Sequence, residues 1–143
     1  MTQISDAKAA LIAYLLADTD TATEVGTRVY GDKLPRADTD DMARKAVVVA
    51  SGGGGLNPVT RGTMTLNEER YDFFCYGATL FEAEEVRRAV HGALRALKRE
   101  TISSVLLHSA EPAGGASTGL DPVTDWPVKW NSWTILADER TVA

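Results

Sequence analysis

The chain has 143 residues, of which 44% are hydrophobic and 24% are charged, and its formal net charge is −5. This size and composition predict a single globular domain over residues 1–143, with enough surface to bury a core. The acidic balance, without a run of Lys or Arg, argues against specific binding of DNA or RNA.

The N-terminal part predicts a helix followed by a loop. Ser5 is the expected N-cap, and apolar residues recur at helical spacing from Ala7 to Leu15, so the helix should end near residues 16–18. The polar, β-branched segment from Asp18 to Thr23 is expected to be a loop. No basic segment precedes the first apolar run, and no segment reaches the ~20 apolar residues of a membrane span, so we expect neither a signal peptide nor a membrane helix.

Two extended segments and two loops come next. Residues 25–31 (VGTRVYG) lie between glycines and are expected to be extended, and residues 45–51 (KAVVVAS) predict a buried strand. The charged residues 36–44 and the glycine-rich residues 52–61 are expected to be exposed loops. The four glycines do not indicate a phosphate-binding loop, because no Gly-Lys-Ser/Thr follows them and the next residues lead into a strand.

The best-defined part of the sequence is a strand followed by a helix, over residues 70–97. Alternation places Tyr71, Phe73 and Cys75 on one face of the strand, and residues 61–67 are expected to pair with it as a hairpin. Thr79 and Glu82 match the Ser/Thr-x-x-Glu capping box at a helix start. The helix has an apolar stripe made of Ala83, Val86, Val90, Ala93, Leu94 and Leu97.

The C-terminal part predicts two more strands, over residues 101–109 and 127–137, separated by a Gly/Pro-rich loop over residues 111–126. Most strands are then linked without a helix, which favours an α+β fold: a single mainly antiparallel sheet with two helices packed on one face. Trp130 and Trp133 should lie on opposite faces of the last strand, so that one packs in the core and the other is exposed. An exposed tryptophan is a typical anchor of a protein contact.

Residues that could carry chemistry are few. Cys75 is the single cysteine, and its position within a strand indicates a buried side chain. A thiol enzyme acting through Cys75 with His91 or His108 stays an alternative. The two histidines have no partners at ligand spacing, so we expect no metal site. We also expect no cofactor and no catalytic residue.

The order of these segments resembles the tail terminator, or tail completion, proteins of long-tailed phages and gene transfer agents. The resemblance rests on VGTRVYGDKLP, the valine-rich strand, RYDFFCYGAT and FEAEEVRRAVHGALRAL. It covers residues 4 to about 97 and leaves residues 111–126 as a variable loop. The resemblance implies an α+β fold, no enzymatic activity, and a hexameric ring at the head-proximal end of the tail tube. Such a ring ends tail growth and joins the tail to the head–neck complex.

The resemblance also implies partners and a location. The partners would be further copies of the chain, the tail tube protein and a head–tail connector or stopper protein. DNA would pass through the lumen without specific binding, no membrane would be involved, and the protein would belong to a virion assembled in the host cytoplasm. The family has no residue signature to carry over, so the interface candidates come from loops, which can become ordered on assembly, and from tryptophans. They are Arg36, Arg44, Gly52, Gly53, Gly54, Gly55, Leu56, Asn57, Arg61, Trp130 and Trp133.

Other functions stay open from the sequence. The chain could be a different neck component, such as a head–tail stopper or connector. It could also be a small cytoplasmic adaptor, or the thiol enzyme described above.

Overall fold

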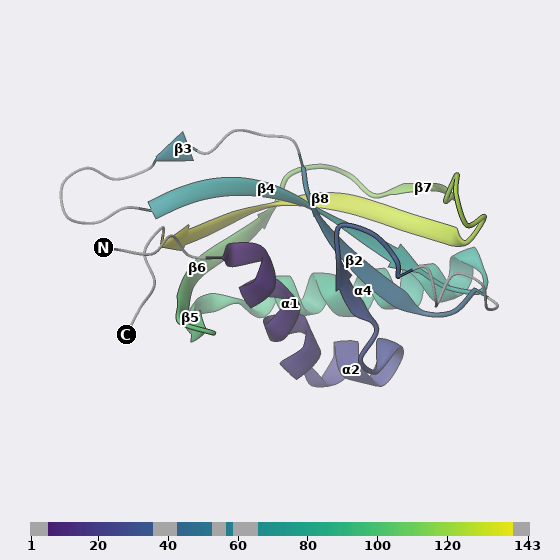
Figure 1. The fold of residues 1–143 in the computed structure, drawn as a ribbon, viewed down its shortest axis with the longest axis horizontal. Coiled ribbons are helices and arrows are strands. Elements are labelled where there is room, and N and C mark those ends of the chain that lie inside the picture. Colours follow the sequence, from purple (N-terminus) through teal and green to yellow (C-terminus); the bar gives the residue numbers. More distant parts are fainter. Residues whose placement is uncertain (1–5, 36–42, 53–56, 59–65, 139–143) are drawn as a thin grey trace.

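A computed structural model of the chain describes residues 6–35, 43–52, 57–58 and 66–138 (Figure 1). Its elements are, in chain order, α1 (Ala7–Ala17), α2 (Thr19–Val25), β1 (Val29–Gly31), β2 (Ala46–Ser51), β3 (Asn57–Pro58), β4 (Leu66–Tyr76), α4 (Leu80–Ala96), β5 (Lys98–Ile102), β6 (Val105–Pro112), β7 (Ser117–Leu120) and β8 (Pro127–Asp138).

The strands form one curled sheet with the order β1-β2-β4-β8-β6-β5, while β3 pairs with β4 and β7 pairs with β8. Among the described strands, β1 and β2 pair in parallel and the remaining pairs are antiparallel. The central pair runs along all of β4, from Leu66 opposite Asp138 to Tyr76 opposite Val128. The predicted α+β fold with a mainly antiparallel sheet is therefore confirmed.

The helices pack on one face of the sheet, below it in Figure 1. The structure has three helices in the described residues, so the prediction of two was wrong. The segment expected to be a loop forms α2, because Asp18 caps it by accepting hydrogen bonds from the backbone N and the Oγ1 of Thr21. Thr21 and Val25 are fully buried. Tertiary packing thus outweighs the low helix propensity of this segment.

The strand and helix of residues 70–97 form as the sequence predicts. Tyr71, Phe73 and Cys75 point into the core beneath the sheet, where the apolar stripe of α4 covers them. Thr79 is the N-cap of α4, and its Oγ1 accepts a hydrogen bond from the backbone N of Glu82 at 3.2 Å. The N-cap of α1, by contrast, is Asp6 and not Ser5, since the Asp6 carboxylate accepts from the N of Ala9.

Several boundaries in the remaining strands differ from the prediction. Residues 101–109 do not form one strand, because Ser103 and Ser104 adopt positive φ angles of 51° and 64° and turn the chain between β5 and β6. The expected loop over 111–126 contains β7, which pairs with β8. The extended segment starts only at Val29, after Gly26 ends α2. The predicted hairpin partner at 61–67 lies outside the described residues except for the start of β4.

Candidate functional site

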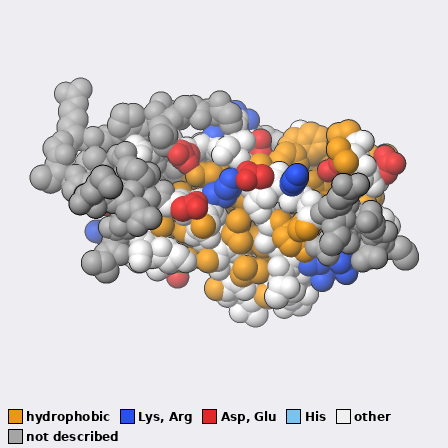
Figure 2. All heavy atoms as spheres, viewed as in Figure 1, with side chains coloured by type: hydrophobic (Ala, Val, Ile, Leu, Met, Phe, Trp, Pro, Cys, Tyr) orange, Lys and Arg blue, Asp and Glu red, His pale blue; other side chains and the backbone are white. Residues whose placement is uncertain are grey.

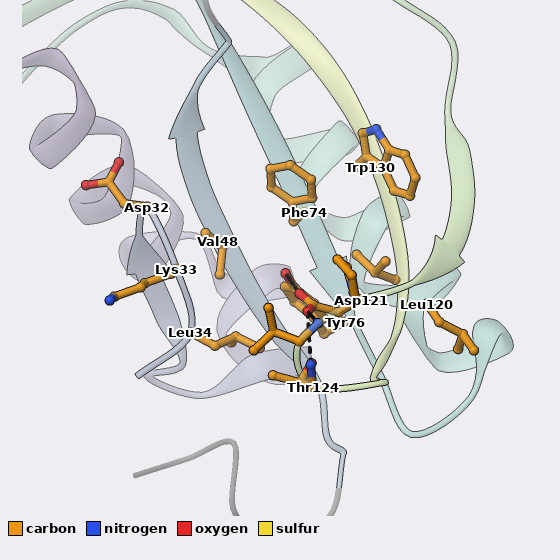
Figure 3. Close-up of a pocket in the computed structure, with 13 residues that line it drawn as sticks. Asp32, Lys33, Leu34, Val48, Phe74, Tyr76, Leu120, Asp121, Thr124 and Trp130 are labelled. Carbon is orange, nitrogen blue, oxygen red and sulfur yellow. Dashed lines mark hydrogen bonds between the residues drawn. The ribbon is translucent and has the colours of Figure 1, made fainter. Parts of the chain in front are cut away.

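The outer face of the sheet, opposite the helices, carries a groove of about 860 Å³ (Figure 3). Its floor comes from the three central strands: Val48 of β2, Phe74 and Tyr76 of β4, and Val128 and Trp130 of β8. One wall is the segment 32–34 that follows β1, and the other is the segment 120–124 between β7 and β8. The groove therefore joins residues that are far apart in the sequence.

The aromatic floor follows from strand alternation. Since Phe73 and Cys75 point into the core, Phe74 and Tyr76 must point to the outer face. Phe74 lies opposite Trp130 on β8, with the ring centroids 6.0 Å apart. Such a tilted aromatic pair forms a rigid apolar surface.

A tight turn holds the wall between β7 and β8. The Asp121 carboxylate accepts hydrogen bonds from the backbone N of Val123 at 2.8 Å and of Thr124 at 3.1 Å, and from the hydroxyl of Tyr76 at 3.0 Å. Burial raises the pKa of Asp121, but these hydrogen bonds outweigh it, and the net pKa is lowered. Burial first, and the Asp121 charge second, raise the pKa of Tyr76. The pair thus stays a fixed carboxylate and a neutral phenol, which suits a structural role and not proton transfer.

Apolar side chains on this wall are open to solvent. Leu120 is 63% exposed and Val123 is 90% exposed, whereas Trp126 in the same turn is buried against Tyr76. Figure 2 shows hydrophobic side chains gathered over the end of the molecule where β7 lies. Exposed apolar surface around a groove is typical of a site that binds another molecule.

The two tryptophans expected on opposite faces do lie there, with different consequences. Trp130 is half-buried and lines the groove, so it is available for contact. Trp133 is 0% exposed and packs edge-on against His91 in the core, with 5.0 Å between ring centroids. Trp133 is therefore a core residue, and its side chain is not accessible to another protein in the folded monomer.

The loop residues expected at an interface do not line the groove where the structure describes them. Gly52 continues the pairing of β2, because its N donates to the carbonyl of Arg70 at 2.8 Å. A Cβ there would lie 2.8 Å from Cγ of Arg70, so the strand needs a glycine at this position. Arg44 is half-buried, and Asn57 starts β3. The other candidates lie outside the described residues: Arg36, Gly53, Gly54, Gly55, Leu56 and Arg61.

The groove residues that the sequence did not single out include Leu34, Leu120 and Val123. A signal was present at the end of β7 and in the turn after it, where Leu120 and Val123 are aliphatic residues among Asp, Thr and Pro. Strand alternation also places Phe74 on the face opposite Phe73 and Cys75, but nothing in the sequence alone connects it with Trp130.

Cys75 and His91, which the sequence offered as candidates for catalysis, lie in or against the core. Cys75 is 0% exposed, and burial raises the pKa of its thiol to about 12, so almost no thiolate exists at neutral pH. Desolvation also lowers the pKa of His91. Among the residues that the structure describes, no group of three or more His, Cys, Asp or Glu side chains could hold a metal ion, and no helix is long and apolar enough to cross a membrane.

Comparison with solved structures shows a similarity in fold, whereas the other comparisons find no match. No protein-family model matches the chain, and no curated protein matches it. Among solved structures, the chain is similar to a chain in the virion of a native gene transfer agent particle, with a TM-score of 0.68 and 20% sequence identity. The similarity covers 92% of this chain and 93% of that chain. At this level of identity, the match shows a shared fold over nearly the whole chain.

Proposed function

We propose that this chain is a structural protein of a virion or of a virus-like gene transfer particle. The observation that carries the proposal is the fold similarity to a gene transfer agent virion chain, which extends over 92% of this chain. The resemblance noted in the sequence leads to the same kind of particle by an independent route, since it rests on the order of motifs and not on coordinates.

Within such a particle, the proposed role is that of a tail terminator. In this role, copies of the chain form a hexameric ring at the head-proximal end of the tail tube, stop tube growth and join the tail to a connector or stopper protein. The exposed apolar groove supports a role in contacts between proteins, because a protein that acts alone rarely leaves such surface open. The net charge of −5 is consistent with a lumen through which DNA passes without being held.

A role without catalysis is part of the proposal. The buried thiol of Cys75, with its pKa near 12, counts against a thiol enzyme. The ionised Asp121 and the neutral Tyr76 in the groove are held by hydrogen bonds to each other and to the backbone, which leaves no acid–base pair poised near neutral pH.

The test is to delete the gene from a genome that produces particles and to image the particles by electron microscopy. We expect heads without attached tails and tails of abnormal length, both restored when the wild-type gene is supplied in trans. Native mass measurement of the purified protein over a range of concentrations should detect a ring. Particles of normal tail length and normal head attachment in the deletion strain would overturn the proposal.

A further inference from the structure

The outward side of α4 carries features that the folded monomer does not use. Phe81 is 77% exposed at the start of the helix. Gly92 is exposed in the middle of the helix, and a Cβ built there would have no atom within 4 Å. Glycine is a weak helix former, and no neighbour in the described residues requires it here. A glycine on an open helix face allows another backbone to approach closely.

These features lie on one side of the helix. Phe81, Glu85, Arg88, Gly92 and Arg95 recur at spacings of three and four residues, so they form a single stripe. The opposite stripe of α4 is buried against the sheet. The exposed stripe therefore runs from an aromatic side chain at the N-terminal end, past Arg88 in the middle of the helix, to Arg95 in its last turn.

The groove is complementary in chemical character to the exposed stripe of α4. Its floor is apolar and aromatic, Lys33 stands on one wall, and Asp121 lies on the other. Asp125 is exposed in the same turn as Asp121. The stripe on α4 also carries both signs, with Glu85 one turn after Phe81 and the exposed Arg88 two turns after it, and Glu85 also pairs with Lys45 of its own chain at 3.6 Å. The stripe thus carries an aromatic residue, one acid and two arginines, while the apolar groove is flanked by one base and three acids, since Asp32 stands beside Lys33.

The two surfaces lie on opposite faces of the sheet, since α4 packs on the core that holds Phe73 and the groove lies over the second cluster with Val48 and Val128. One copy therefore presents its helix stripe on one side and its groove on the other. Contacts between two different surfaces of identical chains repeat head to tail and close into a ring when the rotation allows.

We infer that the occupant of the groove is a second copy of this chain: Phe81 of one subunit inserts between the groove walls of the next, against Phe74 and Trp130. Arg88 then lies by the acidic turn of the next subunit, and Gly92 lets the two backbones approach. This inference rests on the proposed ring and identifies the surfaces that build it. A peptide segment of a different virion protein is the competing occupant, and the experiments below separate the two.

The first experiment traps the contact as a disulfide. F81C and L120C place one cysteine on each surface, while the native Cys75 is fully buried and does not interfere. A disulfide forms only when the two Cα atoms come within about 7 Å, so bridging reports direct contact. We expect cross-linked dimers when the two single variants are mixed, and a ladder ending at the ring size when one chain carries both substitutions.

Each variant alone should stay monomeric on a non-reducing gel, because the contact joins unlike surfaces. The matched control uses L16C in place of F81C. Leu16 is another exposed apolar residue, on α1, and L16C mixed with L120C should not cross-link. Dimers from F81C alone would indicate a symmetric contact and overturn the inference. The inference would also be overturned if native mass measurement detected rings while the mixed pair did not cross-link. A protein that stayed monomeric at every concentration would overturn it as well.

The second experiment separates this inference from the proposed function. F81D changes only an exposed side chain, so its urea midpoint should match the wild type while ring formation falls at least tenfold. The deletion strain supplied with F81D should then show the tail defects of the deletion itself. If F81D restores normal tails in a strain whose deletion shows the defects, the inference fails and the proposed function stands. If the deletion has no defect, the proposed function fails whatever the cross-linking result.

Discussion

The junction between β4 and α4 depends on a buried glycine, and its replacement gives a direct test of the packing. A Cβ at Gly77 would lie 2.6 Å from the backbone N of Ala83 and 2.6 Å from Cβ of Glu82. Ordinary contacts between non-bonded heavy atoms are about 3.5–4.0 Å. Ala83 N belongs to the first turn of α4, and the N of Gly77 donates to the carbonyl of Pro127 on β8. Neither side of the junction can move without shifting a whole element.

The magnitude of the effect follows from two opposing terms. Forcing an extra carbon into a closely packed site costs about 1–3 kcal/mol, and two clashes with the helix start favour the upper end. Alanine restricts the unfolded chain more than glycine does, and this effect stabilises the folded protein by about 0.4–1 kcal/mol. We therefore expect Gly77→Ala to lower the free energy of unfolding by about 2 kcal/mol. For a domain of this size, that is a fall in Tm of roughly 8 °C.

The assay is urea unfolding followed by tryptophan fluorescence, at a protein concentration low enough to keep the chain monomeric. Gly92→Ala is the matched control, since it adds the same methyl group in a helix where nothing lies within 4 Å. It should raise stability by about 0.5–1 kcal/mol. If Gly77→Ala stays within about 0.5 kcal/mol of the wild type, or if both substitutions shift stability in the same direction, the steric argument is wrong.

Three further predictions test the fold and the chemistry. Asp18→Ala removes the cap of α2 and should cost about 1 kcal/mol in urea unfolding, whereas Asp18→Asn should keep most of it. Hydrogen bonds from Arg87, and then Lys129, lower the pKa of Glu84 to about 2, so its stabilising effect is complete above pH 4.5 and is lost as the pH falls toward 2. Glu84→Gln should therefore cost about 1 kcal/mol at pH 7 and progressively less below pH 4.5, as urea midpoints measured across this range would detect. Cys75 should react with a thiol reagent at pH 7 far more slowly in the native protein than in urea, and fast native labelling would revive the thiol enzyme.

The sequence predicts the β4–α4 part of the fold well because its signals are local and agree with one another. Alternation sets which residues of β4 face the core, and a capping residue and an apolar stripe set the start and the buried side of α4. Lys129 and Arg87 then hold Glu84 between the helix and β8. The long-range contact with Lys129 strengthens an arrangement that the local pattern already specifies.

The errors occur where distant contacts decide the local structure. The segment of α2 has a polar, β-branched sequence, and it becomes helical because Thr21 and Val25 are buried in the core. The turn between β5 and β6 uses Ser103 and Ser104 with positive φ, a conformation that glycine or asparagine usually signals. Apart from the Asp18 cap of α2, neither choice is visible in a local pattern.

The groove was only partly predictable, for a related reason. The outward direction of Phe74 and the placement of Trp130 and Trp133 on opposite faces follow from alternation alone. The groove itself needs the register that sets Phe74 opposite Trp130 and the hydrogen bonds that fold residues 121–124 into a wall. Register between strands far apart in the sequence depends on the whole sheet.

The position of each candidate residue also decides what a substitution there can reveal. Trp133 is fully buried, so replacing it would disturb folding and assembly together and could not separate them. Leu120 and Val123 are mostly exposed, and surface substitutions usually change stability by no more than about 0.5 kcal/mol. A loss of assembly on changing either of these residues therefore reports on the contact itself. For this reason, the groove and the exposed stripe of α4 are better places to look for function than the buried tryptophan.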